Sequence, residues 1–467
     1  MAAKVITNLQ TRRDEFGEPT DLESGAISRF AGSLFLLIAP IGFLGAYPLK
    51  PTLLLLLSLI AIGALFLLPR ESLLRLRLSP ALIAYVAWAM ASLSWSESPS
   101  ATLFLMRSVL PAVVAMAVVA AFLPIATWQL IFARSMEIIV VITLLAILTS
   151  SAARATVGAN GVDVAGWRGY FIHKNVMSPA LSVAVVTILA FETNRRAAWA
   201  FVLAVTVILV PSHSATGLIA LMLGLSTWVL TGWMARSAPR ERSMTAITLA
   251  LGGVFLVGVG VRSAAYWVGA FDKDITFTGR TEIWAASAPY LAERPWTGYG
   301  LAGPYGALSN VIARDIFDTI GFYVVHAHNG LMDLMATLGL VGVAIVVTLI
   351  VVTVRDAWLV IEARPELSRW VLTLMAVILF TSFTENTLAP HYVAVIGAAR
   401  ILVMRERGAM KEMSVARARD QWRRQRIEST PEPGLFASGE QDARSQRSNR
   451  DPKHVQREGS VWDPPEI

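Results

Sequence analysis

Long apolar runs recur along most of the chain, beginning near Phe30 and ending near Met404. About 20 apolar residues in a helix are needed to cross the hydrocarbon core of a bilayer, which is about 30 Å thick. The runs show no alternation of apolar and polar residues, and lipid offers no partner to an unpaired backbone group, so helices are expected. The sequence therefore predicts an all-α, polytopic membrane protein.

The composition agrees with this fold class. Hydrophobic residues make up 55% of the 467 residues and charged residues make up 16%, whereas roughly 25% of the residues in a soluble domain are charged. A chain so poor in charge cannot cover itself with polar surface. It contains no cysteine, which excludes disulfides and thiolate chemistry.

We predict about twelve transmembrane helices from the positions of the apolar runs. They fall at residues 30–47, 51–69, 79–95, 102–123, 128–149, 176–192, 197–211, 215–234, 244–262, 330–354, 368–386 and 389–404. The longest loop, from about residue 263 to 329, separates the ninth helix from the tenth. A smaller polar loop runs from about residue 150 to 175.

Arginines in the short connectors predict the orientation, because cytoplasmic loops are enriched in Lys and Arg. They follow the second, sixth, eighth and tenth predicted helices, at Arg70, Arg75, Arg77, Arg195, Arg196, Arg236, Arg240, Arg242, Arg355, Arg364 and Arg369. The opposite connectors, 96–101, 211–214 and 387–388, contain neither Lys nor Arg. Both termini are then cytoplasmic, and both polar loops are extracytoplasmic.

This pattern divides the chain into three parts. Residues 1–28 form a cytoplasmic tail without the apolar core of a signal peptide, and residues 29–404 form the helical bundle. Residues 405–467 begin with a basic segment that can lie as a helix on anionic lipid, and they become disordered from about Ser429. The net charge of +7 therefore reflects membrane orientation, and we expect no nucleic-acid partner.

Two of the six histidines, His326 and His328, lie directly before the tenth predicted helix. Residues two apart share a face in extended backbone, and Asn329 is a favoured N-cap residue. The helix N-terminus beside His328 favours a bound anion and a neutral imidazole, as a general base requires. Two other readings stay open at this point, a cap without a catalytic role and a metal site completed by Asp315, Asp318, Asp333 or His391.

Basic residues in both polar loops are further candidates for binding an anion. Arg280 presents a planar fork suited to phosphate oxygens, and the smaller loop ends in Arg168, His173 and Lys174 before another helix. Arg107 lies inside the fourth predicted helix, so it should face the bundle interior or water and have a partner or an anionic ligand; the alternative is that its side chain extends to the membrane interface. Glu385 could be that partner, or it could position His328. The turn from Pro295 to Gly306 is aromatic and suited to stacking sugars.

Several motifs taken together resemble one family of membrane enzymes. The order WRGYFIHKN, PSHSATG, FTGRTEIW, ERPWTGYG, HAHNGLMDLMATLGLVG and TENTLAP is similar to the bacterial O-antigen ligase and polysaccharide polymerase family, particularly its exopolysaccharide polymerase branch. The resemblance covers about Gly166 to Ala394. It implies a glycosyltransferase at the outer face of the bacterial inner membrane, with a polyprenyl-diphosphate-linked glycan as donor and without a cofactor, nucleotide sugar or essential metal.

The resemblance also implies roles for individual residues. His328 matches a histidine proposed to activate the acceptor hydroxyl, Arg280 matches an arginine proposed to bind the diphosphate, and Arg168 and Lys174 match basic residues of the smaller loop. Relatives place an Arg or Lys where this chain has Ala215, and His213 is the expected replacement. The candidate catalytic residues are thus His328 and Arg280, and the candidate substrate-binding residues are Arg168, Lys174, His173, His326, Asn329, Arg107, Glu385 and His213.

Three functions are compatible with these motifs. The first is a polymerase that joins lipid-linked repeat units into exopolysaccharide, and the second is a ligase that passes the glycan to a lipid A core. Both imply a glycan or lipid acceptor and the surrounding membrane lipid as partners, and a chain-length regulator and a flippase are further candidate partners. The third is an envelope lipid or polysaccharide transporter, which predicts ionisable residues at mid-membrane and paired broken helices.

Overall fold

The computed structural model describes residues 26–43, 51–68, 77–157, 163–246, 248, 280–305 and 310–428. The chain divides into two compact units, Met1–Ala409 and Met410–Ile467. Every element below except the second part of α16 belongs to the first unit. The described part of the second unit is helical from Met410 to Glu428.

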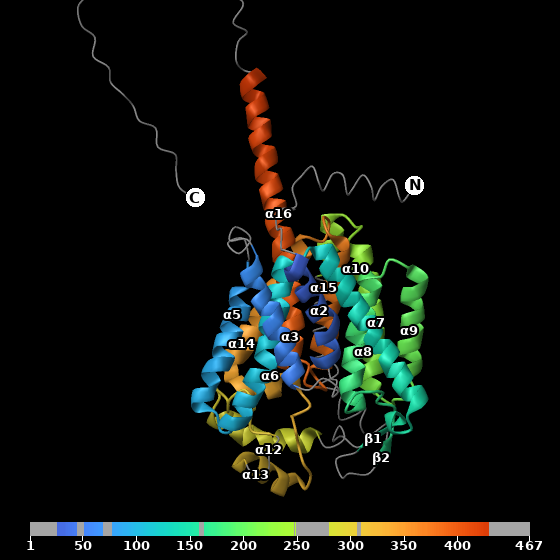
Figure 1. The fold of residues 1–467 in the computed structure, drawn as a ribbon, viewed down its shortest axis with the longest axis vertical. Coiled ribbons are helices and arrows are strands. Elements are labelled where there is room, and N and C mark those ends of the chain that lie inside the picture. Colours follow the sequence, from blue (N-terminus) through green and yellow to red (C-terminus); the bar gives the residue numbers. More distant parts are fainter. Residues whose placement is uncertain are drawn as a thin grey trace, which may run out of the picture. The chain divides into compact units, whose positions relative to one another are not determined.

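The described residues are almost entirely helical, which confirms the predicted fold class in its main feature (Figure 1). The α-helices are α2 (Ala26–Phe43), α3 (Pro51–Gly63), α5 (Pro80–Ala91), α6 (Pro99–Phe122), α7 (Ile125–Thr149), α8 (Lys174–Phe191), α9 (Arg195–Leu209), α10 (Ala215–Met234), α12 (Arg280–Glu293), α13 (Val311–Ile320), α14 (Gly330–Leu359), α15 (Pro365–Thr381) and α16 (Pro390–Glu428). Short 3₁₀ helices occupy η1 (Ala64–Leu67), η2 (Ser92–Trp95) and η3 (Ala152–Arg154).

One small sheet departs from the all-helical prediction. Strands β1 (Ala155–Val157) and β2 (Asp163–Ala165) pair antiparallel, with Ala155 opposite Ala165. Three residues per strand are too few to show the alternation by which a strand is recognised in a sequence.

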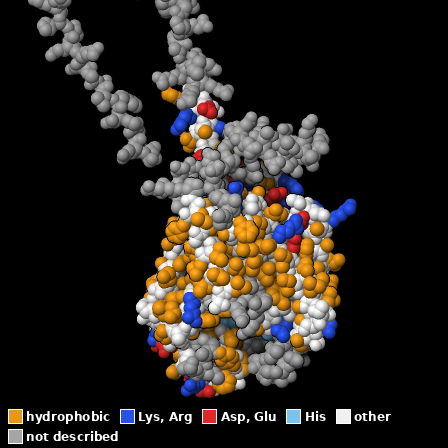
Figure 2. All heavy atoms as spheres, viewed as in Figure 1, with side chains coloured by type: hydrophobic (Ala, Val, Ile, Leu, Met, Phe, Trp, Pro, Cys, Tyr) orange, Lys and Arg blue, Asp and Glu red, His pale blue; other side chains and the backbone are white. Residues whose placement is uncertain are grey.

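Five of the described helices are long and apolar enough to cross a membrane, namely α6, α7, α8, α10 and α14. Shorter apolar helices cover 28–41, 51–67 and 80–95. These helices indicate a multi-pass membrane protein, and Figure 2 shows hydrophobic side chains over most of the visible flank. Described helical residues overlap every predicted span, although only residues 244–246 and 248 of the span 244–262 are described.

Helix α8 forms the centre of the part of the bundle that carries the smaller loop. It packs against α7, α9, α10 and α15, and every residue from Met177 to Phe191 is buried. Helix α14 packs against α5 and α15 on the other side. Both α8 and α14 begin at the end of the bundle where α12, α13 and the small sheet lie (Figure 1). We call this end the loop end.

Helix α14 is broken at Gly339, whose φ of 65° and ψ of −170° are not helical. A Cβ at this position would lie 2.2 Å from the carbonyl oxygen of Trp296. The chain between Pro295 and Gly300 enters the break and supplies the missing backbone partners. The N–H groups of Leu340 and Val341 donate to the carbonyls of Pro295 and Trp296, at 2.8 and 3.3 Å.

The carbonyls before the break are satisfied as well. The N–H groups of Tyr299 and Gly300 donate to Ala336 and Thr337, each at 2.9 Å, and the indole N–H of Trp88 donates to Leu338 at 2.9 Å. The turn that we expected to stack sugars therefore serves mainly as packing, since Tyr299 and Tyr305 are buried. Trp296 remains 66% exposed.

The opposite end of the bundle holds ion pairs between helices. Asp356 of α14 pairs with Arg400 and Arg407 of α16, and Arg405 donates to the carbonyls of Ala120 and Leu123 at the end of α6. The basic segment that we predicted to begin the tail is thus helical, and its first arginines pack into the bundle. Residues 1–25 and 429–467 lie outside the described residues.

Candidate active site

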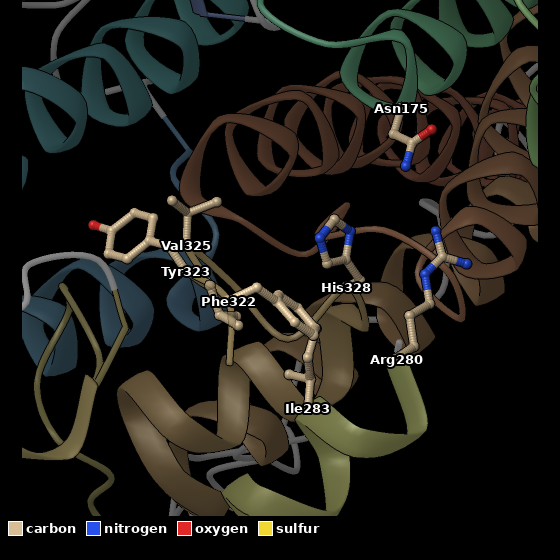
Figure 3. A pocket seen from close by; sticks show the side chains of 8 residues that line it. Asn175, Arg280, Ile283, Phe322, Tyr323, Val325 and His328 are labelled. Atoms are coloured by element: carbon tan, nitrogen blue, oxygen red, sulfur yellow. The ribbon is translucent and has the colours of Figure 1, made fainter. Parts of the chain in front are cut away.

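The candidate site lies at the loop end, where three stretches distant in sequence meet. Residues 326–329, which we call the histidine segment, precede α14. Arg280 begins α12, and Glu385 lies in the turn between α15 and α16. A pocket of about 150 Å³ opens beside them, lined by Asn175, Arg280, Ile283, Phe322, Tyr323, Val324, Val325 and His328. Figure 3 shows Asn175, His328 and Arg280 toward one side of this pocket, with Tyr323 and Val325 toward the other.

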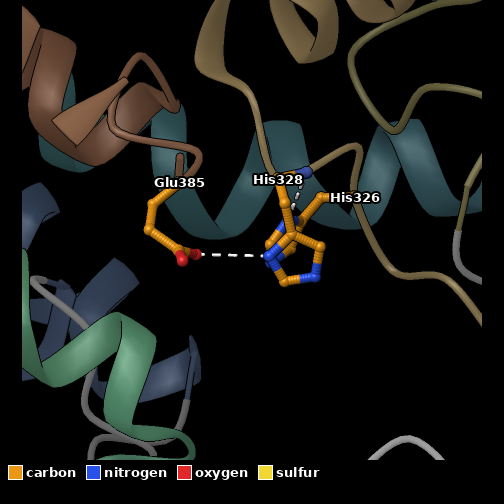
Figure 4. Close-up of side chains that lie close together, drawn as sticks. All are labelled: His326, His328 and Glu385. Carbon is orange, nitrogen blue, oxygen red and sulfur yellow. Dashed lines mark hydrogen bonds and ion pairs between the residues drawn. The ribbon is translucent and has the colours of Figure 1, made fainter. Parts of the chain in front are cut away.

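The carboxylate of Glu385 joins the two candidate catalytic residues. Its Oε1 lies 2.7 Å from Nη2 of Arg280, and its Oε2 lies 3.3 Å from Nδ1 of His328 (Figure 4). The side chain of Glu385 is 6% exposed, that of Arg280 14% and that of His328 27%. When Glu385 is ionised, its carboxylate can only accept, so Nδ1 of His328 then carries the proton and Nε2 keeps the lone pair that a base needs.

Burial keeps the imidazoles of the site neutral. It lowers the pKa of His328 to about 4, and the charge of Arg280 acts in the same direction. Burial lowers the pKa of His326 to about 3, with His328, His173 and Arg280 contributing. Burial lowers the pKa of His173 to about 4, followed by the charges of His328, Lys174, Arg168 and Arg280. We attributed a neutral His328 to the helix N-terminus, and the structure adds burial and Arg280 as causes.

Glu385 responds to burial in the opposite sense. Burial raises the pKa of its carboxyl to about 8, although Arg280 lowers it. A buried carboxyl and a buried imidazole each resist charging, so they titrate as a coupled pair with Arg280 as the nearby fixed cation. The ion pair with Arg280 opposes the effect of burial and favours the ionised form of Glu385.

The histidine segment is bent at His328, whereas the convergence that we considered for the two histidines depended on extended backbone. The φ of His328 is 51°, in the left-handed region that side chains other than glycine rarely adopt. Its N–H donates to Nδ1 of His326 at 3.2 Å, and the two rings lie 4.0 Å apart. The rings do converge, but through a left-handed turn. The predicted N-cap is confirmed, since the side chain of Asn329 accepts from Leu331 and Met332 at 3.0 and 3.1 Å.

Arg168 is engaged by its own loop. Its Nε donates to the carbonyls of Ala152 and Ala155 at 3.1 and 3.0 Å, and its Nη1 donates to Phe171 at 3.1 Å. These bonds give Arg168 a role in shaping the smaller loop. Any contact with a substrate would have to compete with them.

The other residues of the smaller loop lie at the start of α8. Nδ1 of His173 accepts from the N–H of Asn175 at 3.1 Å and caps the helix. Lys174 extends over Gly166, where a Cβ would lie 3.0 Å from Nζ. Gly166 has a φ of 140° and leaves room for that ammonium group. Asn175 lines the pocket, so the start of α8 reaches the same pocket as His328.

Two predicted site residues lie apart from the pocket lining. Arg107 is exposed on α6, with its guanidinium carbon 5.4 Å from the ring of Phe104. Of the two roles considered for Glu385, the structure agrees with the contact to His328 and not with a pairing with Arg107, because the carboxylate contacts Arg280 and His328. His213 is exposed in the turn before α10, with a φ of 52°.

A metal ion remains a rival occupant of the histidine cluster. Ligand atoms of His326, His328 and Glu385 lie within 4.8 Å of one another. Arg280 already contacts this carboxylate, so a divalent cation would have to displace a fixed positive charge. Of the third ligands we considered, Asp315 accepts from Tyr290 and Asp333 accepts from Ala327, so both have other partners.

Trp284 and the apolar wall of the pocket were not among the predicted site residues. Trp284 follows Arg280 by four residues and therefore shares its face of α12, which was a usable signal. The wall at Phe322–Val325 belongs to a short apolar run directly before the histidines.

Comparison with known families adds one finding to this geometry. Residues 199–347 match the O-antigen ligase family. The matched segment contains His213, Arg280, His326, His328 and Asn329. Arg107, Glu385 and the smaller loop lie outside it. No curated protein matches the chain.

The match supports O-antigen ligase or polymerase-type glycan processing by a membrane protein. It covers the helices from α9 to the middle of α14 and does not single out the exopolysaccharide branch. Arg280 and His328 lie inside the matched segment, whereas Glu385 and Asn175 reach the same place from outside it.

Proposed function

We propose that this protein transfers a glycan from a polyprenyl diphosphate to a hydroxyl group of an acceptor, in exopolysaccharide biosynthesis at the outer face of the bacterial inner membrane. The observation that supports this most is the contact of one buried carboxylate with both Arg280 and His328 beside a pocket. The family match and the apolar helices support the reaction class and the membrane setting.

The reaction is a displacement at the anomeric carbon. Nε2 of His328 takes the proton of the acceptor hydroxyl while that oxygen forms a bond to the carbon. The bond from the carbon to the diphosphate oxygen breaks, and its electron pair leaves with the polyprenyl diphosphate. Arg280 neutralises the charge that grows on the leaving group, and Glu385 holds the imidazole in the reactive tautomer.

The two sides of the pocket fit the two parts of such a donor. Arg280, His328 and Asn175 offer a cation and hydrogen-bonding groups for the diphosphate and the sugar. Phe322, Val325 and their neighbours form an apolar wall suited to a sugar face or to the first isoprene unit. Lys174 lies close enough to affect the ionisation of His173 and is the second candidate cation.

A ligase that uses a lipid A core as acceptor is the second candidate function, since it requires the same donor site. A transporter is less well supported. Its ionisable residues would lie at mid-membrane, whereas Arg280, His328 and Glu385 gather at the loop end. The break in α14 is filled by the chain at 295–300, which gives it a packing role.

The test uses purified full-length protein in lipid nanodiscs with a polyprenyl-diphosphate oligosaccharide. We expect longer glycans and free polyprenyl diphosphate with donor alone, and rates unchanged by EDTA if Arg280 replaces a metal. Product only on addition of a lipid A core would favour the ligase. No product with either acceptor, from protein that binds the donor, would contradict glycan transfer.

The Arg280→Lys variant tests whether the diphosphate needs the two-pronged hydrogen bonding of a guanidinium or only a positive charge. We expect a loss of about 10- to 100-fold in transfer, because an ammonium cannot reproduce the guanidinium fork. Arg314→Lys on α13 is the matched control. Full activity in Arg280→Lys would remove this arginine from the phosphate role.

A further inference from the structure

The peptide groups on either side of Ala327, between the two histidines, are held by buried side chains. The N–H of Ala327 donates to Oδ1 of Asp333 at 2.7 Å, and its carbonyl accepts from the indole N–H of Trp284 at 2.8 Å. Ala327 is 0% exposed. Both backbone polar groups of Ala327 are therefore hydrogen-bonded, and the peptide units before and after it are held in place.

The two side chains come from the two helices that carry the site. Trp284 lies on α12, one turn after Arg280, and Asp333 lies on α14, one turn after the Asn329 cap. Ala327 also belongs to a buried cluster with residues of both regions, including Ile283 of α12 and Ala336 of α14. The position of Arg280 is thereby tied to that of the histidine segment.

The local backbone gives a reason for such bonds. His328 has a left-handed φ of 51°, a conformation that persists in a side-chain-bearing residue only where the surroundings enforce it. The bonds to Ala327 fix the residue directly before it, and the Asn329 cap fixes the residue directly after it. The direction of the imidazole therefore depends on both.

Burial of the Asp333 carboxyl lowers the stability of the fold. It is buried, and its Oδ2 has no hydrogen-bond partner among the described residues. Half-satisfied buried carboxylates lower stability, so their presence calls for an explanation in function. Holding the histidine segment supplies one.

We propose that Trp284 and Asp333 are positioning residues, which together hold the Ala327 backbone so that His328 meets Arg280 and Glu385 in reactive geometry. This inference rests on the proposed function, because it assigns His328 the role of base. Neither residue lines the pocket. Their loss should lower kcat and leave the KM for the donor nearly unchanged.

Asp333 is tested by comparing two substitutions. Asp333→Asn keeps an oxygen acceptor for the N–H of Ala327, and we expect activity within about threefold of the wild type. Asp333→Leu keeps the volume and removes the acceptor, and we expect kcat to fall about 100-fold, as for a catalytic group displaced by about 1 Å. Equal activity in the two variants would overturn the role of Asp333.

Trp284→Phe provides a second test should Asp333→Leu fail to fold. It removes the N–H and keeps an aromatic ring, and we expect kcat to fall about tenfold through misalignment. Trp88→Phe is the matched control, because Trp88 also donates its indole N–H to a backbone carbonyl of this region, that of Leu338. Equal kcat losses in Trp284→Phe and Trp88→Phe would mean that the effect is general packing.

A measurement without turnover separates this inference from the proposed function. Diethyl pyrocarbonate modifies exposed neutral imidazoles, and peptide mass spectrometry gives the rate at His328. We expect a faster rate in Asp333→Leu and Trp284→Phe than in the wild type, Asp333→Asn or Trp88→Phe. Unchanged rates would overturn the positioning role, whereas changed rates in a protein whose His328→Ala variant stays active would overturn only the proposed function.

Discussion

Glu385 connects the charge of the site with its geometry. Its two oxygens contact an imidazole and a guanidinium that belong to different parts of the chain. With Glu385 ionised, His328 holds its proton on Nδ1, and Arg280 stays near the place where the leaving group would develop charge. An uncharged side chain at this position cannot do both.

Glu385→Gln should therefore reduce transfer by about 100-fold or more, because the tautomer of the base is no longer fixed. Donor affinity should change much less, since Arg280 remains. Steady-state rates and donor titrations in nanodiscs measure the two effects. Glu282→Gln makes the same chemical change at an exposed position on α12 and should be silent, and a Glu385→Gln variant with wild-type turnover would exclude this role.

The three histidines of the site predict how stability depends on pH. Their pKa values fall from 6.5 when unfolded to about 4, 3 and 4 in the fold, for His173, His326 and His328. Depressed values mean that their contribution is present above about pH 6.5 and is lost as the pH falls toward 4. The raised pKa of Glu385 acts oppositely, losing its contribution as the pH rises from 4.5 to about 8.

We expect the unfolding temperature of the purified protein to fall between pH 6.5 and 4.5. His173→Asn keeps an N-cap for α8 and removes one titrating group, so the pH dependence should become shallower by up to about one proton. Thermal scans of both proteins across this range provide the comparison. Parallel curves would show that His173 does not titrate with the fold.

The break in helix α14 is the clearest feature of secondary structure that the sequence does not predict. An apolar run predicts one continuous helix, and no proline marks the break at Gly339. The break depends on the segment at 295–300, which lies about 40 residues earlier and belongs to the turn that we assigned to sugar stacking. Only the packed structure shows that this turn completes the hydrogen bonds of a helix.

Gly339→Ala should destabilise the protein by about 2 kcal/mol or more, because the new Cβ would meet the Trp296 carbonyl and the φ of 65° is unfavourable for alanine. Gly63→Ala is the control. Gly63 has helical φ and ψ and open space at its Cβ, so it should gain about 0.5–1 kcal/mol. Denaturant or thermal unfolding of both variants measures the difference, and equal stability would mean that the break is not enforced by this contact.

Across the whole chain, the sequence predicts best those features that neighbouring residues determine. Hydropathy located the apolar helices but not α12 and α13, which lie within the predicted loop 263–329. The Asn329 cap follows from its position before an apolar run. The contact of Arg280 with Glu385 spans 105 residues, and nothing in local spacing selects it over a pairing of Glu385 with Arg107. The bend at His328 was missed for the same reason, since distant side chains hold it.

The orientation of the bundle stays a prediction from the arginine pattern, and the absence of cysteine makes it directly testable. Ser151→Cys lies at the loop end and Ala238→Cys at the opposite end, and both positions are exposed. We expect a membrane-impermeant maleimide to label Ser151→Cys in intact cells and Ala238→Cys only after permeabilisation. The reverse pattern would place the loop end in the cytoplasm.

The central claim is that His328 takes the proton of the acceptor hydroxyl. Asparagine tolerates left-handed backbone and lacks a basic nitrogen, so His328→Asn should bind the polyprenyl-diphosphate donor within about threefold of the wild type. Its rate of glycan transfer in the same nanodisc preparation should fall by about 100- to 10,000-fold. A His328→Asn protein that binds the donor and transfers glycan at the wild-type rate would contradict the account.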